Sequence, residues 1–181
     1  TNSGYSVTFT PTDTTNYNTA TISNLPITVN PLQLSMTAPA VTSSKVYDGS
    51  TSAAATVGTI SNKVGNDDVT VAVVSATYDT ATVGTGKTIT VNYSLSGRDA
   101  GNYNVPANDT ISSGEITKAT PIITANPTAA AITYGGALST SALTGGTASV
   151  AGSFAWTTGT TVPTVTNSGY NVTFTPEDTT N

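Results

Sequence analysis

Most residue types that perform chemistry in proteins are missing from this chain of 181 residues, which contains no histidine and no cysteine. Their absence excludes a Ser-His-Asp triad, a cysteine nucleophile and every metal site built on nitrogen or thiolate ligands, whatever the fold. Carboxylates remain at Asp48, Asp67, Asp68 and Asp99, among others. Glycoside hydrolysis, however, needs two carboxylates about 5–10 Å apart across a cleft. We therefore expect no enzymatic activity and no cofactor.

One short acidic stretch is a weak candidate for a metal ion. Asp67 and Asp68 follow Gly65 and Asn66, and their carboxylate and carbonyl oxygens are of the kind that Ca²⁺ prefers. The stretch lacks the alternating Asp-x-Asp-x-Asp spacing of a calcium loop, and the same residues fit a solvated turn between strands. We therefore name Asp67 and Asp68 as calcium candidates but expect no metal site.

The composition predicts an all-β protein. Charged residues make up only 8% of the chain and helix formers are scarce, whereas Thr, Val, Ile and Tyr are plentiful. Five basic residues stand against ten acidic ones, giving a net charge of −5. Because the basic residues do not cluster, we expect no nucleic-acid partner. No apolar run approaches the roughly 20 residues that cross a bilayer, so we expect no membrane insertion.

A long internal repeat organises the chain. Residues 1–16 recur as residues 166–181 with differences at only two positions, so the repeat length is 165 residues, from position 1 to position 166. A weaker copy lies inside the repeat, where Asp99, Gly101 and Tyr103 align with the stretch from Asp13 to Tyr17. The repeat is thus two related modules in alternation. We predict three segments, residues 1–30, 31–118 and 119–181.

Short alternating strands agree with this division. Residues 69–74, 88–93 and 172–175 alternate or nearly alternate apolar and polar side chains between Gly, Asn, Asp and Pro residues. The Asp99-x-Gly101-x-Tyr103 spacing is that of the corner between strands E and F of immunoglobulin domains, where the tyrosine hydroxyl bonds to nearby backbone. The fold we predict is all-β, with tandem immunoglobulin-like β-sandwiches in a linear array.

Two families resemble these modules. Residues 31–118, with Tyr47-Asp48-Gly49 and the run ending at Tyr103, resemble the YDG-type repeat of bacterial surface proteins. Residues 119–181, with Tyr134-Gly-Gly and Asn167-Ser-Gly-Tyr, resemble the MBG module, a mostly bacterial immunoglobulin-like domain. The resemblance implies a structural stalk or spacer repeat of an extracellular, adhesin-like protein on the bacterial cell surface. It brings no catalytic residues, so Tyr47, Asp48 and Gly49 are signature positions only.

The repeat boundaries also predict an interaction between copies. Residues 17–30 correspond to the last hairpin of a preceding module, with Tyr17 opening its first strand, and the segment 119–181 lacks this hairpin. We expect residues 17–30 of a neighbouring copy to complete that segment, either in a longer covalent array or head to tail between chains as a filament. The expected interface residues are Tyr17, Ile22, Leu25, Ile27 and Val29.

Two further expectations attach to the stalk. Lys45 and Lys118 near module starts, with Asn102 and Asn104 near module ends, fit the Lys–Asn isopeptide cross-links of some bacterial immunoglobulin-like stalks, although exposed lysines beside turns explain them equally well. Ser and Thr hydroxyls make a surface glycan a further candidate partner.

The alternative function is a module that binds carbohydrate or a host protein. It predicts exposed aromatic side chains grouped in a concavity. Trp156, with Phe154 two residues earlier, would then be a sugar-stacking platform, whereas our expectation is that both residues pack in the core.

Overall fold

The computed structural model describes residues 4–181. Residues 1–3, which open the predicted segment 1–30, lie outside this range. The described residues form strands β1 to β14 and two short 3-10 helices, with no α-helix, which confirms the all-β class. Within the same range, no helix has the length and apolar character needed to cross a membrane.

The chain divides into two compact units. The first contains the described part of Thr1–Ala38 together with Val57–Ala72 and Tyr93–Ala107, and the second contains all remaining residues. These units do not follow the predicted boundaries at 30/31 and 118/119, because the strands β7 and β8 run from one unit into the other. The three predicted segments therefore stay a prediction.

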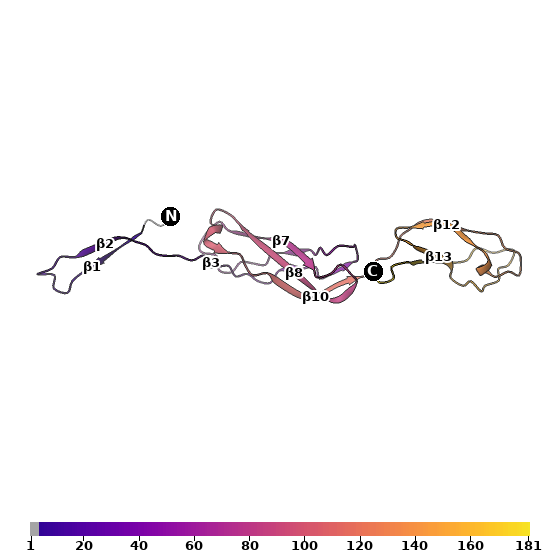
Figure 1. Cartoon of the computed structure of the whole chain (residues 1–181), viewed down its shortest axis with the longest axis horizontal. Coiled ribbons are helices and arrows are strands. Elements are labelled where there is room, and N and C mark those ends of the chain that lie inside the picture. Colours follow the sequence, from indigo (N-terminus) through magenta and orange to yellow (C-terminus); the bar gives the residue numbers. More distant parts are fainter. Residues whose placement is uncertain (1–3) are drawn as a thin grey trace. The chain divides into compact units, whose positions relative to one another are not determined.

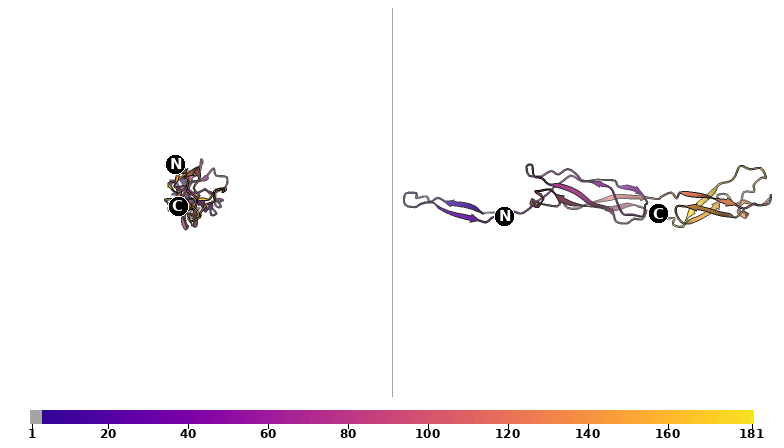
Figure 2. Two further views of the ribbon diagram at one scale, coloured as in Figure 1. Left: turned by 90° about the vertical axis from the view of Figure 1, so that its right-hand side faces the viewer. Right: turned by 90° about the horizontal axis from the view of Figure 1, so that it is seen from above.

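The first unit begins with an antiparallel hairpin of β1 (Tyr5–Phe9) and β2 (Ala20–Leu25) (Figures 1 and 2). The two strands are irregular at one end, where Asn24 has a φ of 63°. Every residue of both strands is exposed. In the register of this hairpin, Val7 is paired with Ile22, Thr8 with Thr21, and Phe9 with Ala20. A two-stranded hairpin without a packed face is at best marginally stable in water.

The rest of the first unit is built from short strands and loops. Strand β3 (Leu32–Gln33) pairs in parallel with β9 (Tyr103–Asn104), which directly follows the 3-10 helix η1 (Ala100–Asn102). Leu34 and Tyr103 are buried here. The pairing of β3 with β9 joins segments about 70 residues apart in the sequence.

Most of the largest sheet lies in the second unit, and its strand order is β5-β10-β8-β7; Figure 1 labels β7, β8 and β10. Strands β5 and β10 are parallel, whereas β10 and β8 are antiparallel. The short strands β4 and β6 form a separate antiparallel pair. The bounds are β4 (Ala40–Val41), β5 (Ser44–Val46), β6 (Ala55–Thr56), β7 (Thr70–Tyr78), β8 (Gly84–Ser96) and β10 (Asp109–Thr117).

The sheet buries one face. In β8 the buried residues Ile89 and Val91 alternate with half-buried polar residues, as the sequence pattern predicts. Tyr78, Ile89 and Ile116 form the core cluster, against which Val41 of β4 and several other partly buried residues pack. The core of this unit therefore lies between the large sheet and the segment that carries β4.

The C-terminal part of the second unit has two further sheets of two antiparallel strands each. Strand β11 (Ile123–Ala129) pairs with β12 (Leu143–Ala148), and β13 (Gly152–Trp156) pairs with β14 (Val172–Pro176). The 3-10 helix η2 (Leu138–Thr140) precedes β12. The predicted strand over residues 172–175 is thus confirmed, and Trp156 and Phe154 share one strand as expected.

The prediction that Tyr17 opens a strand is wrong. This residue does not open a strand, because the segment between β1 and β2 turns at Asp13 and the next strand begins only at Ala20. Residues 17–30 therefore contain one strand, β2, which pairs with β1, and not the predicted hairpin. The Asp13 carboxylate accepts hydrogen bonds from the backbone N–H groups of Thr15 and Asn16, and these bonds favour a turn over an extended strand.

Candidate functional site

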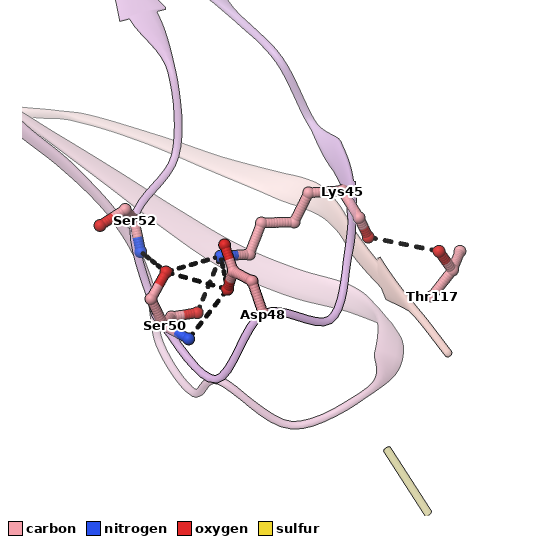
Figure 3. Close-up of polar contacts among 5 residues, drawn as sticks. All are labelled: Lys45, Asp48, Ser50, Ser52 and Thr117. Carbon is pink, nitrogen blue, oxygen red and sulfur yellow. Dashed lines mark hydrogen bonds and ion pairs between the residues drawn. The ribbon is translucent and has the colours of Figure 1, made fainter. Parts of the chain in front are cut away.

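The most densely bonded group of side chains surrounds the Tyr47-Asp48-Gly49 loop (Figure 3). The Lys45 ammonium donates to the Asp48 carboxylate at 2.7 Å and to the carbonyl and hydroxyl oxygens of Ser50 at 2.8 and 3.0 Å. The same Asp48 oxygen also accepts from the backbone N–H and the hydroxyl of Ser50, both at 2.9 Å. The three side chains thus close the loop on itself.

The flanking strands fix Lys45 in place. Strand β5 runs beside β10, and the Tyr47 N–H donates to the Thr117 carbonyl at 2.8 Å. The Lys45 ammonium lies 5.7 Å from the centre of the Tyr78 ring, within the range of a cation–π attraction. Gly49 has a φ of 76°, a conformation that favours glycine. In this loop Tyr47 packs against the core, Asp48 accepts hydrogen bonds, and Gly49 makes the turn.

The electrostatics of this loop keep Asp48 charged. The hydrogen bond from Lys45, followed by those from the backbone and hydroxyl of Ser50, lowers the pKa of Asp48 to about 2. Each of these donors favours the ionised carboxylate. Lys45 and Asp48 form hydrogen bonds with each other and with Ser50 of the same loop. The arrangement therefore acts as a clamp on residues 45–50.

This clamp predicts acid sensitivity. Because the folded protein binds the Asp48 proton less tightly than the unfolded chain does, the contribution of Asp48 to stability is complete above pH ~4 and is lost as the pH falls to about 2. We expect Lys45→Met to reduce this loss of unfolding free energy between pH 5 and pH 2, measured by urea denaturation. Lys63→Met, at an exposed lysine, is the control; equal acid sensitivity of both variants would contradict the clamp.

A second network surrounds Tyr103. Its hydroxyl donates to the Asp67 carboxylate at 2.6 Å and accepts from the Val64 N–H at 3.0 Å. The hydrogen bond to Asp67, with burial, raises the pKa of Tyr103. In the expected immunoglobulin corner, the tyrosine hydroxyl bonds to backbone close by in the sequence. The structure corrects this prediction, because both partners lie in a different loop, 36 and 39 residues upstream.

Asp99 and Asp68 join the same two loops by one hydrogen bond to a side chain and one between backbone groups. The Asp68 N–H donates to the Asp99 carboxylate at 2.8 Å, and the Asp99 N–H donates to the Asp68 carbonyl at 3.0 Å. Gly97 allows this approach, because a Cβ atom there would lie 2.2 Å from the Asp68 carbonyl oxygen. Gly101 has no such constraint, since a Cβ atom there would have no contact within 4 Å. Gly97, which the sequence analysis did not single out, is therefore the structurally required glycine.

Removing the Tyr103 hydroxyl provides a matched test. Tyr103 is 6% exposed, whereas Tyr17, at the aligned position of the other motif copy, is 67% exposed. We expect Tyr103→Phe to lower the thermal midpoint by several degrees, because it leaves Asp67 and the Val64 N–H without their partner. Tyr17→Phe should leave the midpoint unchanged. Circular dichroism at 218 nm would measure both, and equal effects would show that the Tyr103 network is not structural.

Comparison with known proteins finds a match for the part of the chain that contains both networks. Residues 28–112 match the YDG domain. No curated protein and no solved structure matches the chain. The match supports the YDG part of the expected resemblance, and the MBG part stays a prediction. The clamp at Lys45 and the Tyr103 network both lie inside the YDG domain.

The calcium candidates have other roles in the YDG domain. Asp67 accepts from Tyr103, and Asp68 accepts from the Arg98 N–H at 3.2 Å. No three acidic residues gather into a group that could hold a metal ion anywhere between residues 4 and 181.

The structure does not pair the lysines and asparagines named for an isopeptide bond. Lys45 is bound to Asp48 and Ser50, and Lys118 donates to the Thr179 carbonyl. The Asn102 N–H donates to Asp99, and the Asn104 carbonyl accepts from Leu34.

A cavity lies in the C-terminal part of the chain. It has a volume of about 470 Å³, and Tyr134, Trp156 and Tyr170 contribute aromatic rings to its wall. Trp156 is half-buried and its indole N–H donates to the Ser141 carbonyl at 2.9 Å. Phe154 packs on Phe174 with ring centres 5.0 Å apart. The pattern of alternation predicted the strand that carries Trp156, but no sequence signal indicated the cavity.

The five predicted interface residues are all exposed. The exposed fractions of Tyr17, Ile22, Leu25, Ile27 and Val29 range from 46% to 77%. Exposure of this kind over one short segment is unusual for large apolar side chains in a folded domain. The interface itself stays a prediction.

Proposed function

We propose that the chain is a spacer repeat of an extracellular, adhesin-like surface protein of bacteria. The observation that carries the proposal is the recurrence of residues 1–16 at 166–181, with the same turn at Asp13 and at Asp178. The carboxylates of Asp13 and Asp178 accept the same three hydrogen bonds. Two come from the backbone N–H groups two and three residues further on, and the third comes from the side-chain amide of the asparagine three residues further on. Such units are suited to stacking in series.

The part of the chain around the YDG match supports the proposal, because it has a buried core cluster and the Lys45 clamp. Its large sheet and the covering pairs are the layers from which we infer an immunoglobulin-like sandwich for each complete module. Pro31 and Pro121, near the predicted boundaries, fix φ and limit bending between modules. In this proposal the function is reach and stiffness, and no side chain acts as a catalyst.

Scattering from chains of one, two and three repeats tests the spacer. If each repeat contributes two modules with strands near ten residues long, at about 3.3 Å per residue, each added repeat extends the chain by about 70 Å. We expect the maximum dimension in small-angle X-ray scattering to rise linearly with repeat number. A maximum dimension that levels off would show that repeats pack side by side and would refute a spacer.

The aromatic cavity favours a second candidate function, carbohydrate binding. Tyr134, Trp156 and Tyr170 around one concavity are the grouping that the alternative predicts, and rings of this kind stack on apolar sugar faces. Trp156 is the only tryptophan, so its fluorescence reports directly on the site. A glycan that shifts this emission in the wild type, and loses affinity with Tyr134→Ala, would support binding; no shift across a panel of neutral and acidic glycans would remove it.

A further inference from the structure

One edge of β14 has no partner strand. The Thr157 N–H donates to the Asn171 carbonyl and the Glu177 N–H donates to the Ala151 carbonyl, both at 3.0 Å. In an antiparallel pair, backbone groups alternate between the two edges of a strand. The backbone groups of Val172 and Phe174 therefore point away from β13. No other strand pairs with β14 within the described range of 4–181.

The hairpin shows what pairs with a strand of this sequence. Val172, Thr173 and Phe174 repeat Val7, Thr8 and Phe9 of β1. Strand β1 pairs with β2, and the hydroxyls of Thr8 and Thr21 lie 3.3 Å apart. The chain thus contains the same strand twice, once with β13 as partner and once with β2. Superposing the two partnerships on the shared Val-Thr-Phe sequence would give a three-stranded sheet.

That three-stranded sheet has one apolar face. In the register of the two observed pairs, Ile22 extends the row of Trp156 and Val172, and Ala20 extends the row of Phe154 and Phe174. The threonines occupy the opposite face. The existing rows are half-buried in the C-terminal part.

The two copies of the Val-Thr-Phe sequence are buried to different extents, and the three-stranded sheet explains the difference. Phe9 is 66% exposed, whereas its counterpart Phe174 is half-buried against Phe154. Leu25 stands opposite Tyr5, whose counterpart Tyr170 lines the cavity. Strand β2 has the apolar side chains for this wall, and its residues are exposed.

We propose that the free edge of β14 binds strand β2 of a second copy, antiparallel, with Ile22 opposite Val172, Thr21 opposite Thr173 and Ala20 opposite Phe174. In this exchange β14 of one copy replaces β1 of the other. The ladder is conserved, while Ile22 and Leu25 move from water to the wall of the aromatic cavity. The inference deepens the proposed function, since the same pairing would join consecutive repeats.

Single cysteines test the register, because the native chain has none. Mixing Thr21→Cys with Thr173→Cys under mild oxidation should yield a disulfide-linked heterodimer on non-reducing gels. Mixing Thr21→Cys with Thr175→Cys, two residues along the same strand face, is the control. Since the shifted pair lies beyond disulfide reach, we expect roughly tenfold more heterodimer from the first mixture.

Each outcome decides the proposal. Preference for Thr173 over Thr175, together with loss of the cross-link when Ile22→Asp is added to the Thr21→Cys chain, supports it. Equal yields from both mixtures overturn it, and so does a glycan that occupies the cavity without reducing the cross-link. If the cross-link does not form as expected, the predicted linear rise of the maximum dimension with repeat number in covalent arrays is not affected. The strand exchange and the spacer function are therefore tested separately.

Discussion

Ile89→Ala should lower the free energy of unfolding of the YDG domain by about 2–5 kcal/mol. Ile89 has an exposed fraction of 0% and lies with Tyr78 and Ile116 in the core cluster. Truncation removes buried methyl groups and leaves a cavity that the rigid strand β8 cannot close. Urea denaturation followed by circular dichroism would measure the change in midpoint at constant slope.

The control for this substitution lies in the neighbouring strand. Val74 of β7 is also β-branched but is exposed, so Val74→Ala should change the free energy of unfolding by no more than about 0.5 kcal/mol. Comparable effects at both positions would mean that the large sheet does not bury the face that contains Ile89.

The part of the fold that the sequence predicts is the part governed by alternation. In β8, Ile89 and Val91 alternate with polar residues, and the strand over 172–175 ends beside Pro176, so both follow from local pattern alone. The repeat of residues 1–16 at 166–181 gives Asp13 and Asp178 equivalent turns, because these turns are closed by residues within three positions.

Contacts between distant segments were not predictable in this way. Asp13 and Asp99 have the same spacing to a tyrosine, yet Tyr17 is exposed and Tyr103 is buried, because only Tyr103 has a loop from another part of its unit to cover it. The Lys45 clamp was missed for a different reason. Its donor and acceptor are close in sequence, but a Lys-x-x-Asp pair is too common to indicate a site.

A chain extended by a second copy of residues 17–30 after Asn181 should be more stable and should no longer exchange strands. The appended residues would follow residues 166–181 as residues 17–30 follow 1–16, so the partner of β14 would be supplied within the same chain. We expect the Trp156 emission to shift to shorter wavelength, because the strand closes the sheet beside its ring. The heterodimer between Thr21→Cys and Thr173→Cys should disappear when the Thr173→Cys chain carries the extension.

The size of this effect follows from the two side chains that the extension buries. Full burial of an isoleucine and a leucine contributes about 1.5–3 kcal/mol each, and ordering the added backbone offsets much of that sum. A net gain on the order of 1–3 kcal/mol would raise the thermal midpoint of this part of the chain by about 4 °C or more. The matched control carries the same extension with the counterparts of Ile22 and Leu25 changed to aspartate. If both extended chains melt at the same temperature as the original, β14 does not use this edge, and the aromatic cavity needs another occupant.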